Sequence, residues 1–287
     1  MMMVVVLAAC GGDDRVFVDA APADAATRDG ETAPVDAAVD ATVDATPELT
    51  APVTLAPALG TLCGVGYDHV QARIWVYPCN GAMLHAFTAT GAAAGTLPRP
   101  GEAANDVDIA VAPAPIVVGT TAVAAGGLLF VNGETGTADI HLPDTAASVP
   151  LMTSFGASHV VGGGYHRERG TFFVVQDNVP GTSPNTVAEL DRTTGAVVSA
   201  FSIAPAFDVS YGDLEVCPSS GHLFVVSSIE PRIAELTATG TLVATYPLPA
   251  NVTRVSGLAL GPDGQAWVVG TGGELWKLAG LPCSATP

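Results

Sequence analysis

Residues 257–268 read Gly-Leu-Ala-Leu-Gly-Pro-Asp-Gly-Gln-Ala-Trp-Val, and this pattern decides the fold. A short apolar run leads into a Gly-Pro-Asp-Gly turn and then into an apolar–aromatic–Val triplet, which is typical of two short strands joined by a tight turn. The triplet occurs five times at a spacing of about 48 residues. The five copies are Ile74-Trp75-Val76, Leu129-Phe130-Val131, Phe172-Phe173-Val174, Leu223-Phe224-Val225 and Ala266-Trp267-Val268.

Each triplet lies between two further strand-like segments. A Gly-rich or Asp-bearing segment comes before it, at 64–69, 106–113, 160–166, 212–218 and 256–262. Another segment follows it, at 83–87, 137–141, 186–190, 232–236 and 274–278, and in two units a Thr-Gly turn leads into a fourth. Four short antiparallel strands repeated at this period are typical of propeller blades. A two-sheet sandwich is the weaker alternative, because it does not explain five aromatic residues in phase.

The units resemble the blades of NHL-type and related bacterial repeat propellers, whose pattern is Gly-Leu-Ala-x-x-Pro-x-Gly-x-x-Trp-Val. Residues 257–268 and 213–236 match it best, and the resemblance covers nearly all of 60–280. It implies an all-β, five-bladed β-propeller over residues 53–287 and says little about function. Because the last unit stops after its third strand at Leu278, we expect Val53–Leu59 to close the ring as its fourth strand.

The chain begins with an apolar run that ends Leu7-Ala8-Ala9-Cys10. This is similar to the lipobox of bacterial lipoproteins, so residues 1–10 are interpreted as a signal and Cys10 as the lipidated residue. The resemblance implies anchoring in the cell envelope, at the outer membrane or the cell surface. An apolar stub with an unrelated cysteine is the alternative. Residues 11–52 are rich in Ala, Asp, Thr and Pro and poor in large apolar side chains, so we expect a disordered tether.

The charge of the chain limits its partners. Its 287 residues carry a formal net charge of −18, and Lys277 is the one lysine. Such a chain cannot form the basic stripe that phosphate backbones require, so nucleic-acid binding is excluded. The expected partners are a membrane, through the lipid alone, and an unknown small molecule or envelope protein. We expect a monomer.

Four cysteines remain after Cys10, and an even number in an oxidising compartment favours two disulfides. Cys63 begins the first inner segment and Cys79 ends the strand after it, so the two fall opposite one another across a hairpin. Cys63–Cys79 is therefore the favoured pairing, which leaves Cys217 with Cys283. No cysteine or histidine spacing typical of zinc is present.

Carboxylates mark the inner segments. Aligning these segments on residues 69, 113, 166, 218 and 262 gives Asp108 and Asp213 equivalent positions, with Glu215 on the same side. We expect these three side chains to converge at the axis. Nearer one mouth, on the same side, the alignment places Asp106, His159 and Tyr211.

Three interpretations of these residues stay open. Asp106, Asp108, Asp213 and Glu215 could bind calcium, the one cofactor that the pattern indicates, with His159 and Tyr211 as ligand-binding residues beside it. The carboxylates could instead act as a glycosidase-like acid/base pair. In the third interpretation they are structural and bind backbone amides or water. We favour a lipid-anchored module that binds a ligand or protein, and the alternative is a propeller-type enzyme, either a carbohydrate hydrolase or a lyase/lactonase.

Overall fold

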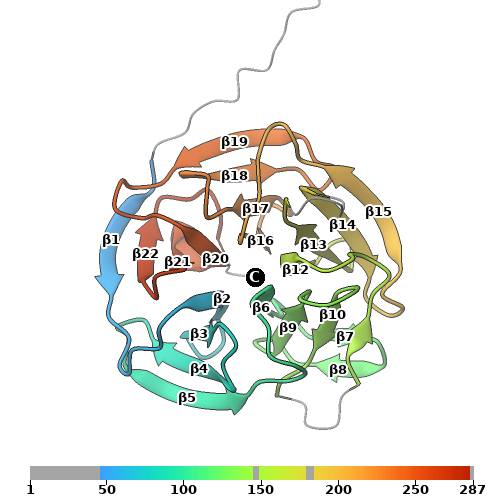
Figure 1. Cartoon of the computed structure of the whole chain (residues 1–287), viewed down its shortest axis with the longest axis horizontal. Helices are drawn as coiled ribbons and strands as arrows, with labels where there is room; N and C mark the ends of the chain where they lie inside the picture. The colour runs from blue at the N-terminus through green and yellow to red at the C-terminus, as the bar shows by residue number, and fades with distance from the viewer. Residues whose placement is uncertain (1–45, 145–148, 179–183, 285–287) are drawn as a thin grey trace, which may run out of the picture. The chain divides into compact units, whose positions relative to one another are not determined.

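The computed structural model describes residues 46–144, 149–178 and 184–284. They form five four-stranded antiparallel sheets around a common centre, which confirms the five-bladed β-propeller (Figure 1). The 3₁₀ turn Pro262–Gly264 is the one helical segment in these ranges, and none of their helices could span a bilayer. The predicted lipobox and residues 11–45 of the predicted tether lie outside the described residues.

Each sheet is one blade, and its strands are given from the centre outward. Blade 1 consists of β2 (Leu62–Asp68), β3 (Arg73–Pro78), β4 (Met83–Thr88) and β5 (Ala93–Pro98). Blade 2 consists of β6 (Val107–Val111), β9 (Leu128–Asn132), β10 (Asp139–His141) and β11 (Leu151–Met152), with a hairpin of β7 (Ile116–Val118) and β8 (Thr121–Val123) inserted after β6.

The other three blades follow the same order from the centre outward. Blade 3 consists of β12 (Val160–His166), β13 (Thr171–Gln176), β14 (Thr186–Asp191) and β15 (Val197–Ser202). Blade 4 consists of β16 (Asp213–Val216), β17 (Leu223–Val226), β18 (Arg232–Leu236) and β19 (Leu242–Pro247). Blade 5 consists of β20 (Val255–Leu260), β21 (Ala266–Gly270), β22 (Leu275–Ala279) and β1 (Glu48–Val53).

The N-terminal strand closes the ring, but it lies earlier in the chain than expected. β1 pairs with β22 from Glu48 opposite Ala279 to Val53 opposite Leu275. The prediction of Val53–Leu59 was therefore wrong in its bounds, and the tether cannot extend to residue 52. The apolar residues after Val53 have another role, because Leu55 packs in the core between blades 1 and 5 while the chain crosses to β2.

The repeated aromatic residues form the core between blades. Trp75, Phe130, Phe173, Phe224 and Trp267 all lie in the second strand of their blade, and none is more than 7% exposed. Neighbouring blades share each apolar cluster: Phe173 of β13, for example, packs with Leu214 of β16. The inner strands contact one another around the ring in the order β2, β6, β12, β16, β20 and β2 again. This packing fixes the strands that carry the carboxylates.

Both predicted disulfides are present. Cys63 and Cys79 join across the β2–β3 hairpin with their Cα atoms 5.1 Å apart. Cys217 and Cys283 join the end of β16 to the C-terminal segment with their Cα atoms 5.8 Å apart. The second bridge therefore ties blade 4 to the segment that follows blade 5.

Candidate functional site

Asp108, Asp213 and Glu215 do meet near the axis, as the sequence predicted. Asp108 and Asp213 are fully buried, and their carboxyl groups lie near each other. Asp213 also accepts backbone hydrogen bonds through both oxygens, from Leu214 N at 2.6 Å and from Leu258 N at 2.7 Å. The third interpretation, in which a carboxylate binds backbone amides, is therefore confirmed for Asp213.

Two carboxyl groups buried near each other repel when both are ionised, which favours a proton on at least one of them. Neither oxygen of Asp108 receives a hydrogen bond from an N–H or hydroxyl group of the described chain. Burial raises the pKa of Asp108 well above its usual range, and the neighbouring Asp213 and Glu215 raise it further. Burial also raises the pKa of Asp213 to about 7, although its backbone hydrogen bonds act in the opposite direction. Asp108 therefore keeps a proton in the folded chain.

Glycines in β12 make room for these carboxyls. A Cβ atom on Gly162 would collide with Asp213 Oδ1, and one on Gly164 would lie 3.2 Å from Glu215 Oε2. Glu215 lines a second cavity of about 30 Å³, beside Tyr67 and Tyr165 at the far ends of the inner strands. Burial, and then the charge of Asp213, raises the pKa of Glu215 well above its usual range.

The predicted alignment of the inner strands was wrong by one residue in blades 2 and 3; in blade 3 the residue equivalent to Asp213 is Gly162. Pairing with the second strands makes Asp213 equivalent to Val107 and Asp108 equivalent to Leu214. Asp108 and Asp213 thus project from opposite faces of their strands and still meet, because the axis is narrow. The alignment failed because it was anchored just after the inner strands end. The number of residues between that anchor and the residue opposite the repeated aromatic differs among blades 2, 3 and 4.

Asp106 is separate from the axial carboxyls and pairs with His159. The Nδ1 atom of His159 lies 2.7 Å from Asp106 Oδ2, and the pair joins the segments before β6 and β12. Asp106 is 3% exposed, and burial raises its pKa to about 6 against the opposing effect of His159. His159 and Ser158 both have left-handed backbone conformations, with φ values of 61° and 82°.

These positions bear on the predicted calcium site. Within the described ranges, no group of three or more His, Cys, Asp and Glu side chains is arranged to hold a metal ion. Both oxygens of Asp213 are engaged by backbone N–H groups, and Asp106 is paired elsewhere. The raised pKa values of the axial carboxyls relieve the axial charge by protonation, without a cation, and calcium stays a prediction from the sequence.

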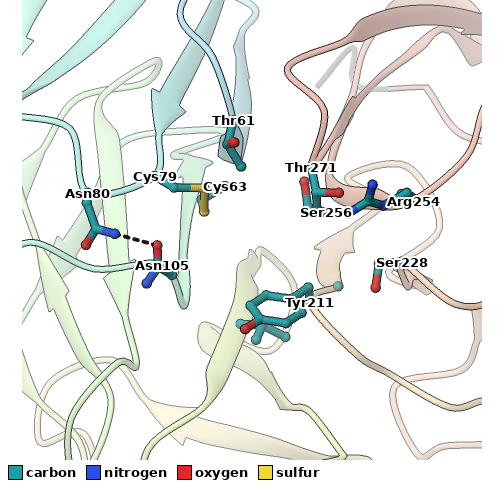
Figure 2. A pocket seen from close by; sticks show the side chains of 12 residues that line it. Thr61, Cys63, Cys79, Asn80, Asn105, Tyr211, Ser228, Arg254, Ser256 and Thr271 are labelled. Atoms are coloured by element: carbon teal, nitrogen blue, oxygen red, sulfur yellow. Dashed lines mark hydrogen bonds between the residues drawn. A yellow bond between two sulfur atoms is a disulfide. The ribbon is translucent and has the colours of Figure 1, made fainter.

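A cavity of about 590 Å³ opens at the mouth of the channel, where the inner strands begin (Figure 2). We call it the mouth cavity. Tyr211 lines it and is 52% exposed, whereas His159 is not among its lining residues. The full lining is Thr61, Cys63, Cys79, Asn80, Asn105, Val161, Tyr211, Gly212, Ser228, Arg254, Ser256 and Thr271.

Sequence reasoning missed Arg254, Ser228 and Thr271, the polar groups that blades 4 and 5 bring to the mouth cavity. Arg254 comes directly before β20, much as His159 comes directly before β12. Extending the strand alignment a few residues toward the N-terminus in every blade would have found it. Ser228 and Thr271 come just after the second strands, outside the inner segments in which acidic residues indicated a site.

No protein-family model matches the chain, and no curated protein sequence matches it. Among solved structures, the glutaminyl cyclase of Myxococcus xanthus covers 83% of this chain and 97% of its own, with 12% identity and a TM-score of 0.56. A gluconolactonase of Xanthomonas campestris covers 86% and 99%, with 15% identity and a TM-score of 0.50. Virginiamycin B lyase from Staphylococcus aureus covers 77% and 66%, with 15% identity and a TM-score of 0.44.

The first two likenesses support the β-propeller fold and do not extend to activity, because both identities are low. The resemblance to NHL-type repeats stays an interpretation of the sequence.

Proposed function

We propose that this propeller is a binding module that holds a small polar molecule in the mouth cavity. The observation that carries the proposal is the cavity itself, because about 590 Å³ lies within the usual range of ligand sites. Its wall combines hydroxyl and amide groups with the exposed ring of Tyr211. Such a lining suits a ligand with several hydrogen-bonding groups and one flat face.

The cavity is built on rigid parts of the fold. Cys63 and Cys79 fix one wall through their disulfide, and Asn80 donates a 2.7 Å hydrogen bond to Asn105 across blades 1 and 2 (Figure 2). On another wall, Ser256 donates hydrogen bonds to the carbonyl groups of Leu62 and Val269. A preformed wall lowers the entropy lost when a ligand binds.

The experiment compares the wild-type chain with Thr61→Trp in a ligand-detected NMR screen of small polar molecules. Thr61 is exposed at the cavity wall, so a tryptophan should fill the cavity without changing the core. Thr193→Trp, on an exposed turn between β14 and β15, is the matched control. We expect binding in wild type and in the control and its loss in Thr61→Trp. Equal binding by all three proteins would contradict the proposal.

A lipid at Cys10 would place the module in the cell envelope, at the outer membrane or the cell surface. The support is the sequence Leu7-Ala8-Ala9-Cys10. Two or three acyl chains anchor a protein stably, whereas one chain gives marginal binding. Metabolic labelling with an alkyne fatty acid should mark the wild-type chain and leave Cys10→Ser unlabelled, and labelling of both would refute the assignment.

The second candidate is a propeller-type enzyme, and the Asp106–His159 pair favours it. A histidine whose Nδ1 donates to a buried carboxylate presents Nε2 as a base, and the side chain of His159 is 35% exposed. The axial pair is a poorer candidate, because Asp108 and Asp213 are fully buried and cannot touch a substrate. Turnover of chromogenic glycosides or lactones that His159→Gln abolishes would favour the enzyme.

A further inference from the structure

One cation without a protein partner lines the mouth cavity. Arg254 lies directly before β20, and its side chain stands with Ser256 and Thr271 on one wall (Figure 2). Within the described ranges, its guanidinium makes no hydrogen bond, ion pair or ring contact, and no other lining side chain is charged. A guanidinium with free donors in a concave site is suited to a planar anion.

The backbone at this wall is strained. Arg254 has a φ of 55° and Tyr211 a φ of 44°, both in the left-handed region that favours glycine. Ahead of β2, the chain uses Gly60 for a left-handed turn, with a φ of 76°. A bulky side chain in this conformation costs on the order of 1 kcal/mol, and such strain gathers at functional sites. Arginine and tyrosine at these two positions thus indicate that their side chains are needed.

A second polar group at this wall also has no partner. The hydroxyl of Thr271 is buried and makes no hydrogen bond with the described chain. The backbone N–H of Thr271 donates to the carbonyl oxygen of Arg254 at 3.1 Å, so the two residues lie side by side. A buried hydroxyl without a partner is costly, and a ligand oxygen would satisfy it.

We propose that the mouth cavity binds a small organic acid, with its carboxylate held by Arg254 and Thr271 and its body against the ring of Tyr211. The inference rests on the proposed binding function and names the ligand class. One carboxylate matches one arginine, which can donate two parallel hydrogen bonds to it. The net charge of −18 disfavours ligands with several negative charges, such as nucleotides.

The test uses three acids and their neutral amides: benzoate with benzamide, acetate with acetamide, and N-acetylglycine with N-acetylglycinamide. Each is titrated into the full chain at constant ionic strength, and the amide NMR signals of Ser256 and Thr271 are followed. We expect at least one acid to bind about 10- to 100-fold more tightly than its amide, the range for hydrogen bonds to a charged group. Arg254→Gln should remove this preference.

Arg167→Gln is the matched control, because Arg167 is exposed and does not line the mouth cavity. It should keep the preference for the acid. If Arg254→Gln fails to fold, Arg254→Lys keeps the charge without the paired donors and should bind the acid with intermediate affinity. An acid affinity unchanged in Arg254→Lys and Arg254→Gln would overturn the assignment of Arg254.

The outcomes separate this inference from the proposed function. If each acid binds the wild-type chain as tightly as its amide and Thr61→Trp abolishes the binding, the cavity does not recognise a carboxylate. The proposed binding function then stands. Failure of every acid and amide to shift the signals of Ser256 and Thr271 at tens of millimolar overturns the carboxylate, and the wider screen then decides the binding module. An acid that shifts signals around Glu215 instead also overturns it, because the second cavity would be the site.

Discussion

Asp108→Asn should lower by about one the number of protons that the chain takes up when it folds. Asp108 is protonated in the folded chain because burial and the charges of Asp213 and Glu215 raise its pKa, whereas the unfolded chain ionises it near its usual pKa of about 4. A carboxyl whose folded pKa is raised contributes stability that is fully present below the unfolded pKa. That contribution is lost as pH rises toward the folded pKa. The free energy of unfolding should therefore fall as pH rises above about 4.

The magnitude follows from proton linkage. For each proton that only the folded chain binds, the free energy of unfolding falls by about 1.4 kcal/mol for every unit by which the pH rises. For Asp213, whose pKa rises from 3.8 to about 7, the loss across that interval is about 4 kcal/mol. The amide of Asp108→Asn is close in size to the protonated carboxyl and does not titrate, so the slope should decrease by about 1.4 kcal/mol per pH unit.

The assay is urea unfolding at several values between pH 5 and pH 7 for wild type, Asp108→Asn and the surface control Asp263→Asn. His85 and His166 have lowered pKa values and oppose the slope, but they are common to all three proteins and cancel in the comparison. We expect the control to match wild type and Asp108→Asn to be less dependent on pH. Equal slopes for Asp108→Asn and wild type would show that Asp108 is ionised in the fold and refute its protonation.

Three further predictions concern the ring and its axis. Gly162→Ala should lower the free energy of unfolding by about 2 kcal/mol or more in urea melts, because its Cβ would collide with Asp213 Oδ1; an unchanged midpoint would contradict the axial packing. Deleting residues 46–53 should lower Tm sharply, whereas deleting 11–45 should not, since only the first deletion removes β1; equal Tm values would contradict the ring closure. Calcium in the millimolar range should leave Tm equal to that in EDTA, and a calcium-dependent rise that Asp213→Asn abolishes would restore the predicted cation site.

The sequence predicted the repeat well because the second strand of each blade has the same environment. Phe173 and Phe224 occupy the same buried place in neighbouring blades, so spacing alone predicted five blades and the order of their strands. The closing strand was harder to place. Val53–Leu59 is as apolar as a strand, and only pairing with β22 shows that Glu48–Val53 is the segment that fits.

The site was predictable in part. Asp108 and Asp213 could be found from their acidic character in apolar strands, but their equivalence failed because the ends of the inner strands are not in register with the strand pairing. The protonation of Asp108 depends on its burial and on the charges of Asp213 and Glu215 in another blade. Arg254 was missed because its importance comes from the absence of a partner, which is a property of the folded chain.

A crystal structure of the protein soaked with benzoate tests most directly whether the mouth cavity is a binding site for organic acids. The account predicts density for benzoate in the cavity, with its carboxylate within hydrogen-bonding distance of the Arg254 guanidinium and the Thr271 hydroxyl. Its ring should lie against Tyr211. A cavity that holds only water at a concentration of benzoate that occupies other places on the protein would contradict the account.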